Sequence, residues 1–194
     1  CSSSLTCVSV ARHSLLAGEC SAALVGGANL QLQPHWSCAF TAAGMLSPTT
    51  RCRFGDDAAD GYVRGEGVGV ILAELVGEAR GRAIARIAGV GVGQDGRSNG
   101  LTAPNPAAQS AVLAACYFDR ADVKSRVACI EAHGTGTKLG DPIELSALGG
   151  AVLGPAGSML RCASIKASIG HLEGCSGLAG LVKAALVVSR PERT

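Results

Sequence analysis

Aromatic residues are scarce in this sequence of 194 residues, in which Phe, Tyr and Trp together make up 3%. Because 47% of the residues are nevertheless hydrophobic, a folded core must be built mainly from Ala, Val, Leu and Ile. A large excess of charge of one sign is also missing, since the formal net charge is only +2. Without a basic stripe or stacking aromatics, nucleic acid is not an expected partner.

Long apolar runs and targeting signals are absent as well. The most apolar stretch, residues 178–188, is short and carries Lys183, so we expect no membrane span. The sequence shows neither a signal peptide nor an initiating Met. A processed lipoprotein would also begin with Cys, but it usually starts with a polar tether, whereas a helical pattern begins here at once.

Cysteine is plentiful, yet its nine copies form no CxxC pair. They lie scattered through apolar segments, as at Cys20, Cys116, Cys129 and Cys162. Buried, reduced thiols explain this distribution better than a disulfide framework does. We therefore expect a reducing compartment and a cytoplasmic location. No two candidate ligands have the tight spacing of a zinc site, so no metal is expected.

Helices are predicted by periodicity and by capping residues. Leu5, Val8 and Leu15 recur near the helical period, which predicts a helix beginning within a residue or two of Cys1. Asn105-Pro106 and Asp141-Pro142 each place a proline after a capping residue. These two helices are predicted to end near Phe118 and Leu148. In the second of them, Glu144 is the acidic residue at the third helical position, as in motifs related to the capping box. The nearly all-apolar segment 176–188 indicates a buried helix.

Short apolar segments predict strands over residues 22–26, 68–74, 83–92, 127–132 and 162–168. Residues 34–67 are rich in Gly, Pro and Asp and are predicted to be loops. Around residue 80 the chain turns through Gly77 and Gly81 and starts a second series. Because strands alternate with helices, we expect parallel βαβ units and an α/β fold.

Cys1 lies at the predicted N-terminus of the first helix. Unpaired backbone N–H groups and the helix macrodipole both favour an anion there, and thus the thiolate nucleophile. The three small serines that follow let an acyl thioester approach closely. The alternative interpretation is an ordinary N-terminal cap.

His133 follows a predicted strand and precedes a Gly-Thr-Gly-Thr loop. A strand end that opens into a glycine loop is where α/β sheets place ligands. The hydroxyls of Thr135 and Thr137 suit a polar chain that approaches the thiol. The alternative is a loop histidine with surface threonines. His13 and His35 are interpreted as structural or surface histidines.

Lys166 is predicted on the strand 162–168, where an apolar setting requires a carboxylate partner or loss of the charge. Glu144 and Glu131 are the candidate partners. His171 follows this strand and precedes the last helix, where a neutral imidazole can donate a hydrogen bond to a developing enolate. The alternative is that Lys166 and His171 lie on solvent-exposed edges of the fold.

Taken together, these blocks resemble the catalytic blocks of the β-ketoacyl synthases. They are CSSSL at residues 1–5, EAHGTGT at 131–137 with GDPIE at 140–144, and KASIGH at 166–171. GYVRGEG at 61–67 and QDGRSNGLTAPN at 94–105 resemble the modular type I polyketide synthase branch. The resemblance covers nearly the whole chain.

The resemblance implies an α/β, thiolase-like fold with five α-β-α-β-α layers, only partly covered by this chain. Residues 1–80 would end the N-terminal half, which carries the nucleophile. Residues 81–194 would form most of the C-terminal half, which carries both histidines. The strand before the nucleophile and the Gly-Phe-Gly loop of the family have no counterpart in this sequence.

The resemblance also implies a catalytic triad of Cys1, His133 and His171. Cys1 would accept an acyl chain from an acyl carrier protein. The two histidines would promote decarboxylation of a malonyl-type extender and stabilise the enolate that attacks the acyl-Cys1 thioester. The result is a decarboxylative Claisen condensation in polyketide, or fatty acid, chain elongation.

Supporting roles follow from the same resemblance. Lys166 matches the family's support lysine and Glu144 its acidic neighbour, while Thr135 and Thr137 match positions that contact the phosphopantetheine arm. This arm is delivered by the acyl carrier protein, and no cofactor is expected to bind directly. The expected partners are the carrier protein, neighbouring synthase domains and, in the complete domain, a second copy.

Two other functions stay open. The chain is alternatively a non-catalytic fragment that folds or acts only with further segments. It is alternatively a Cys–His acyl hydrolase, although two histidines and a lysine exceed what a hydrolase needs and no orienting Asn or Asp motif is evident. A thiolase is disfavoured because it requires a second reactive Cys.

Overall fold

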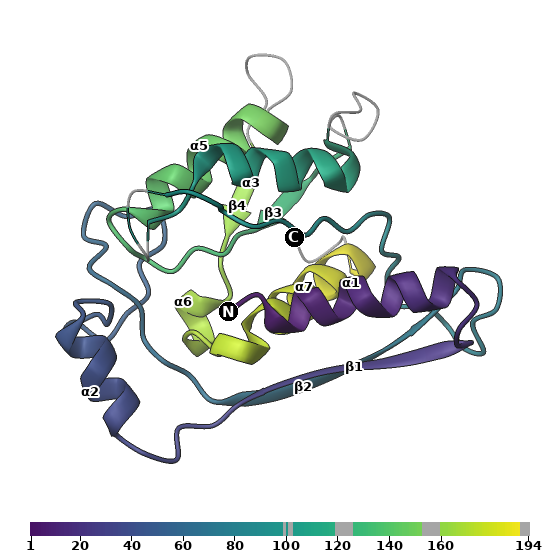
Figure 1. Cartoon of the computed structure of the whole chain (residues 1–194), viewed down its shortest axis with the longest axis horizontal. Coiled ribbons are helices and arrows are strands. Elements are labelled where there is room, and N and C mark those ends of the chain that lie inside the picture. Colours follow the sequence, from purple (N-terminus) through teal and green to yellow (C-terminus); the bar gives the residue numbers. More distant parts are fainter. Residues whose placement is uncertain (99, 101–102, 119–125, 153–159, 191–194) are drawn as a thin grey trace.

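The computed structural model describes residues 1–98, 100, 103–118, 126–152 and 160–190. Its elements stack in layers: α3 and α5 lie over the β3–β4 sheet, α1 and α7 come next, and the β1–β2 sheet follows (Figure 1). The helices are α1 (Ser3–Leu16), α2 (His35–Ala42), α3 (Pro106–Leu113), α5 (Gly140–Val152), α6 (Lys166–Ile169) and α7 (Ser176–Ser189). The strands are β1 (Ala22–Asn29), β2 (Gly67–Glu74), β3 (Cys129–Glu131) and β4 (Arg161–Ala163). Short helical turns at Ala114–Phe118 (η1) and Glu173–Cys175 (η2) continue α3 and precede α7.

β1 and β2 pair antiparallel, with Leu24 opposite Leu72 and Val25 opposite Ile71. The parallel pairing expected from the alternation of strands and helices is therefore wrong for these two strands. Val25 is 3% exposed and faces the helices, whereas Leu24 is 76% and Leu72 60% exposed on the opposite face. Within the described part of the chain, this sheet is thus buried on one side only.

β3 and β4 pair parallel, with Ile130 opposite Cys162. The long helix α5 connects them, so this part is the expected βαβ unit. The order of layers matches four of the five layers of a thiolase-like fold. Among the described residues, no helix lies on the outer face of β1–β2 (Figure 1).

The core lies where α1, β1 and α7 meet. Val8, Val25 and Leu178 are 4%, 3% and 0% exposed and contact one another. Ile71 of β2 packs against this cluster. These are aliphatic side chains, as the scarcity of aromatics predicts.

The capping residue of α3 is confirmed. The side chain of Asn105 accepts hydrogen bonds from the backbone N–H groups of Ala107 (3.0 Å) and Ala108 (3.3 Å). Pro106 follows at the first helical position, where its missing N–H costs nothing. The helical turns continue to Phe118, as predicted.

Three predicted elements differ from the structure. Residues 35–42, expected to be loop, form α2, because Pro34 begins a helix here instead of interrupting one. Residues 83–92, expected to be a strand, form no regular element. The strand predicted over 162–168 ends at Ala163, and α6 begins at Lys166. Of the motif at 94–105, Asn99, Leu101 and Thr102 lie outside the described residues.

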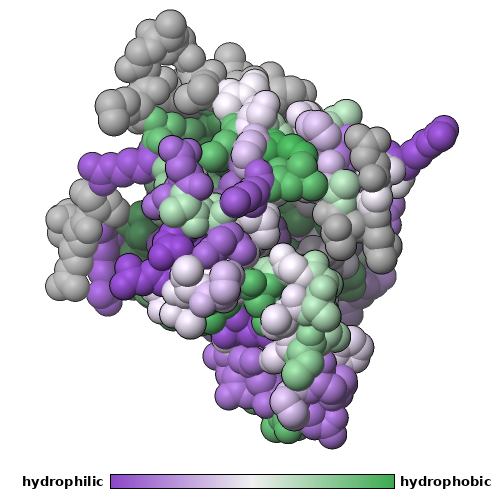
Figure 2. Space-filling model, turned by 90° about the vertical axis from the view of Figure 1, so that its left-hand side faces the viewer, coloured by the Kyte–Doolittle hydropathy of each residue, from purple (hydrophilic) through white to green (hydrophobic). Residues whose placement is uncertain are grey.

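The surface mixes polar and apolar side chains. Figure 2 views the side that carries α2 and shows hydrophobic areas between hydrophilic ones. Trp36 of α2 is 55% exposed and Leu139 56%. None of the helices in the described part of the chain has the length and apolar character needed to cross a membrane.

Candidate active site

The start of α1 is fixed against the start of α7. The backbone N–H of Leu178 donates a hydrogen bond to Ser4 Oγ at 3.0 Å, and Ser4 is 1% exposed. Leu178 lies in the first turn of α7, where N–H groups have no partner within the helix. Ser4 therefore caps another helix, and this contact brings Cys1 and His171 toward the same region.

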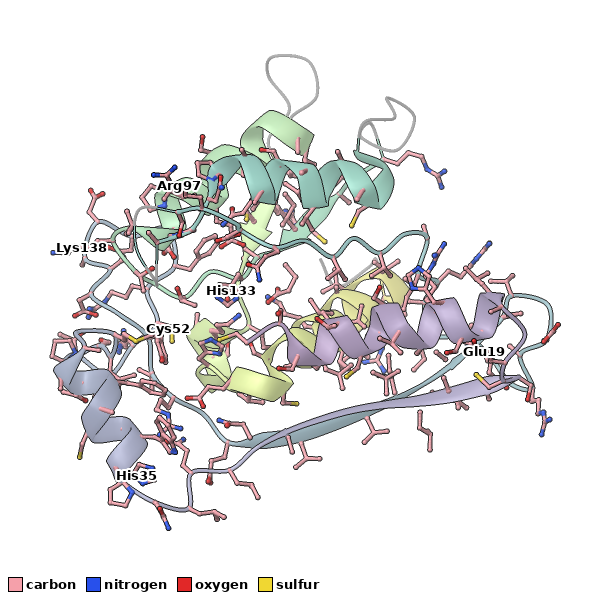
Figure 3. All side chains as sticks on the ribbon, viewed as in Figure 1. Glu19, His35, Cys52, Arg97, His133 and Lys138 are labelled. Atoms are coloured by element: carbon pink, nitrogen blue, oxygen red, sulfur yellow. The ribbon has the colours of Figure 1, made fainter. Side chains whose placement is uncertain are left out.

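The two histidines of the predicted triad lie edge to face. The ring centroids of His133 and His171 are 5.5 Å apart at an interplanar angle of 83°. His133 follows β3, and His171 follows α6. Figure 3 labels His133 near the point where Figure 1 marks the N-terminus.

Both imidazoles are neutral near pH 7. Burial first, and then the positive charge of Lys166, lowers the pKa of His133 to about 4. For His171, burial, His133 and Lys166 lower the pKa to about 3. His133 keeps surface open to solvent, although protein surrounds much of its ring, whereas His171 is 1% exposed. The charge of His133 adds to the shift of His171, and it has no counterpart among the causes of the shift at His133.

The hydrogen bond to His171 selects one tautomer. The backbone N–H of Glu173 donates to His171 Nδ1 at 3.0 Å. A ring nitrogen that accepts a hydrogen bond carries no proton, so the proton of the neutral ring lies on Nε2. The ring of Tyr62 packs edge-on against His171, with centroids 5.1 Å apart. His171 therefore presents an Nε2–H donor.

Glu144 holds the loop that carries His133. Its two carboxylate oxygens accept hydrogen bonds from the backbone N–H groups of His133 (2.6 Å) and Gly134 (2.8 Å). The capping-box interpretation of Glu144 is therefore wrong, because its partners are in this loop. Burial raises the pKa of Glu144, while the two hydrogen bonds and Lys166 oppose the shift.

Asp141 holds the next residues of the same loop. Oδ1 accepts from the backbone N–H groups of Gly136 (3.1 Å) and Thr137 (3.3 Å), and Oδ2 accepts from Gly55 (3.0 Å). Asp141 is 4% exposed. The helix begins at Gly140, so Asp141 is not the N-cap that the sequence pattern predicted. Its carboxylate instead joins the 131–137 loop to the segment around Gly55.

Lys166 is buried close to this loop, at 4% exposure. It is the first residue of α6, so the predicted strand position is wrong. Burial lowers the pKa of Lys166, and the charges of Glu144 and Glu131 act in the opposite direction. Glu131 also accepts from the backbone N–H of Ile165 and pairs with Lys183 at 2.6 Å. Lys166 thus adds positive charge next to both histidines.

Thr135 and Thr137 lie together in the glycine loop. Their hydroxyl oxygens are 3.3 Å apart, and Thr137 Oγ1 accepts from the backbone N–H of Gly140 at 3.1 Å. Thr137 thus helps to hold the start of α5. Both residues are half-buried.

The sequence reasoning missed the part played by residues 52–55. Cys52 is buried, and its Sγ accepts from the backbone N–H of Val63 at 3.1 Å. A side chain at Gly134 would collide with the ring of Phe54, and one at Gly136 would collide with the backbone of Arg53. Nothing in the sequence pattern of residues 52–55 indicates that they pack against the 131–137 loop.

The remaining histidines lie elsewhere. His13 bonds within α1, where Nδ1 is 2.8 Å from the carbonyl oxygen of Ser9. His35 is on α2 beside Trp36, and Figure 3 shows it away from His133. Within the described ranges, no three His, Cys, Asp or Glu side chains gather in a way that suits a metal ion.

Comparisons with known proteins match the chain to one family. Residues 1–79 match the family model described as "Beta-ketoacyl synthase, N-terminal domain", and residues 84–191 match "Beta-ketoacyl synthase, C-terminal domain". Among curated proteins, one component of the phenolphthiocerol/phthiocerol polyketide synthase of Mycobacterium tuberculosis is 49% identical over 97% of this chain. Another component of the same synthase is 47% identical over 97%. The chain spans only 10% and 9% of these two relatives.

Solved structures give the same result. The ketosynthase from module 6 of the bacillaene synthase of Bacillus subtilis 168 superimposes with a TM-score of 0.92 at 38% identity. The oxazolomycin ketosynthase domain of Streptomyces albus JA3453 gives a TM-score of 0.91 at 35% identity. In both comparisons 96% of this chain is covered, against 34% of the solved chain.

Proposed function

Because this chain belongs to the β-ketoacyl synthase family, we propose that it supplies the nucleophile and both imidazoles of a condensing enzyme that elongates polyketide chains. It has part of the thiolase-like fold of the ketosynthases. The observation that carries the proposal is the close pair of neutral imidazoles, His133 and His171, beside the start of the helix that follows Cys1.

The first step is acyl transfer to Cys1. The Cys1 thiolate attacks the carbonyl carbon of an acyl group on the phosphopantetheine thiol of an acyl carrier protein. A new carbon–sulfur bond forms, the old one breaks, and the carrier thiol leaves. Cys1 is exposed, and the free N–H groups at the start of α1 favour the anionic sulfur.

The second step is decarboxylation of a malonyl-type thioester on the carrier protein. The bond between the α-carbon and the carboxylate breaks, carbon dioxide leaves, and the electron pair moves to the thioester oxygen as an enolate. Neutral imidazoles suit this step because each can donate an N–H to that oxygen, as in an oxyanion hole. In His171 the donor is Nε2–H, since Nδ1 accepts from Glu173.

The third step joins the two chains. The enolate α-carbon attacks the acyl-Cys1 carbonyl, a carbon–carbon bond forms, and the Cys1 thiolate leaves. Lys166 contributes by keeping both imidazoles neutral, because its charge disfavours a second positive charge nearby. Glu144 contributes by holding the backbone of His133.

Partners follow from this chemistry. The acyl carrier protein delivers both substrates on phosphopantetheine, and we assign contact with this arm to Thr135 and Thr137. Neighbouring synthase domains and, in the complete domain, a second copy are further proposed partners. Fatty acid elongation uses the same chemistry and is the alternative context, and the cytoplasmic location stays a prediction.

The test is acyl loading of Cys1 within the protein that contains this sequence. After incubation with an acyl thioester, peptide mass spectrometry should find the acyl group on Cys1, and Cys1→Ala should abolish the adduct. Cys7→Ala is the matched control, because Cys7 is an exposed cysteine of the same helix. In Cys1→Gln, malonyl decarboxylation should persist, since the imidazoles remain. An adduct that survives Cys1→Ala would contradict the assignment.

A second candidate is that residues 1–194 fold or act only together with further ketosynthase segments. The outer face of the β1–β2 sheet favours it, because Leu24, Val68 and Val70 are 76%, 69% and 60% exposed there. If the 194-residue chain alone stays unfolded while the longer protein loads Cys1, this candidate holds. A Cys–His hydrolase would instead release the acyl group from Cys1 to water without condensation.

A further inference from the structure

Arg64 lies in a segment whose backbone is joined to His171. The N–H of His171 donates to the carbonyl oxygen of Val63 at 2.7 Å, and the N–H of Gly65 donates to the carbonyl oxygen of His171 at 2.9 Å. These two hydrogen bonds form a parallel bridge between Arg64 and His171. A side chain at Gly65 would collide with the backbone of Ile169, so this close approach requires glycine.

The Arg64 side chain is buried, with 7% of its surface exposed, and each of its three nitrogens donates a hydrogen bond. Its Nε and Nη2 donate to the two carboxylate oxygens of Glu173, at 2.5 Å and 3.2 Å. Nη1 donates to Ser37 Oγ at 2.8 Å, and the guanidinium lies 5.3 Å from the centroid of the Phe40 ring. A bidentate pair of this kind fixes the carboxylate in position as well as in charge.

Glu173 has an unusual backbone conformation, with φ at +40°. Residues with a side chain rarely adopt this left-handed region, and the surrounding structure must hold them there. In this conformation the Glu173 N–H points at His171 Nδ1, at 3.0 Å. The residue held by Arg64 is therefore the one that hydrogen-bonds the imidazole.

We propose that Arg64 is a positioning residue for the condensation: its paired contact holds Glu173 in the left-handed conformation, and the Glu173 N–H then keeps the proton of His171 on Nε2. The inference rests on the proposed function, since it explains how His171 presents an N–H to the thioester oxygen. Arg64 acts through Glu173 and does not itself touch the reacting atoms.

Several other groups near His171 act on the charge of its ring. His133 and Lys166 disfavour the charged ring, and the Tyr62 ring packs against it. These positive charges disfavour protonation of the neutral ring, whereas a hydrogen bond to one ring nitrogen distinguishes its two neutral tautomers. The Glu173 N–H makes this distinction, because only an unprotonated Nδ1 can accept it.

The first measurement follows the ring itself in the protein that contains this sequence. Nitrogen-15 NMR of histidine-labelled protein distinguishes protonated from unprotonated ring nitrogens, and His171→Gln identifies the signals of His171. In the parent protein the proton should be on Nε2. In Arg64→Ala and in the milder Glu173→Gln, a mixture of the two tautomers should appear. An unchanged Nε2–H tautomer in both variants would overturn the proposal.

The second measurement separates positioning from folding. Arg64→Ala should lower malonyl decarboxylation by about tenfold or more, by analogy with sites where a lost partner releases the catalytic imidazole tautomer. Acyl loading of Cys1 should change by less than about threefold, because it does not need the His171 donor. Arg64→Lys should be intermediate, since lysine keeps the charge but not the paired geometry. Equal loss of both activities would indicate a purely structural role and would overturn the proposal.

The control is Arg51→Ala, which removes an exposed arginine of the same connecting segment and should change neither activity. If the parent protein fails to load Cys1, the proposed function fails. The NMR measurement on the ring still tests the link between Arg64 and His171 in that case, so the two failures are distinguishable.

Discussion

Ser4 and Leu178 join the first helix of the chain to the last one through a hydrogen bond of 3.0 Å from the Leu178 N–H to the Ser4 hydroxyl. Both residues are almost fully buried, at 1% and 0% exposure. The bond satisfies an N–H at the start of α7, and it sets Cys1 near the segment that carries His171.

Ser4→Ala should therefore loosen the start of α7. The Leu178 N–H would stay buried without a partner, which costs about 1–2 kcal/mol in local stability. Hydrogen exchange of peptides that cover residues 176–180 should become roughly 5- to 30-fold faster. Ser3→Ala is the control, because Ser3 is exposed and its loss should leave exchange there unchanged. Equal effects of the two substitutions would argue against the cap.

Glu144→Ala should impair the His133 loop. The backbone N–H groups of His133 and Gly134, which donate to this carboxylate, would lose their partner. The imidazole of His133 would then shift. We expect malonyl decarboxylation to fall by about tenfold to a hundredfold, since small displacements in a site are costly. Glu78→Ala removes an exposed carboxylate and should have no effect. A full rate in Glu144→Ala would refute the holding role.

The pH dependence should reflect two depressed imidazole pKa values. Because His133 and His171 have pKa values of about 4 and about 3, decarboxylation should show no loss of rate near the ordinary value of 6.5 as pH falls. If the rate does fall around pH 6.5, the variants His13→Gln and His35→Gln test whether a histidine outside the site is responsible. A fall that persists in both variants would mean that the site histidines titrate normally.

The same pKa values predict lower stability in acid. Between pH 6.5 and about pH 4, these two imidazoles bind protons in the unfolded chain but stay unprotonated in the folded one. The free energy of unfolding should therefore fall as pH falls through this window. Above 6.5 both states hold neutral rings and this contribution is constant. Denaturation midpoints measured across the window check the sign, and a rising midpoint on acidification would contradict it.

Replacement by Ala should change stability in opposite directions at two glycines. Gly136 has φ at +78°, and an added Cβ would lie 2.7 Å from the Arg53 backbone nitrogen. Gly136→Ala should therefore destabilise the loop and lower decarboxylation. At Gly150 in α5 a Cβ meets nothing within 4 Å, so Gly150→Ala should stabilise by about 0.4–1 kcal/mol. Thermal denaturation compares the two, and similar shifts would contradict this geometry.

Local signals in the sequence predicted several elements well. The cap and proline at residues 105–106 marked α3, Pro142 marked the first turn of α5 although Asp141 is not its cap, and apolar periodicity marked α1 and α7. These signals succeed because capping and periodicity act over a few neighbouring residues. Residues 83–92 pair with no strand among the described residues, so their apolar character alone does not make them a strand. The sequence does not predict the helix at 35–42, because a proline at position 34 is equally typical of a loop.

The sequence by itself determined the chemistry available to this protein, because a thiol, two imidazoles, a lysine and several carboxylates have fixed reactivities in any fold. It also determined the family, through blocks of residues in a set order. The tertiary structure alone decided which partner each group has. Glu144 and Asp141 bind the histidine loop instead of their own helix, and Arg64 reaches His171 through Glu173. Such contacts join residues far apart in the chain, so they arise only when packing brings the segments together.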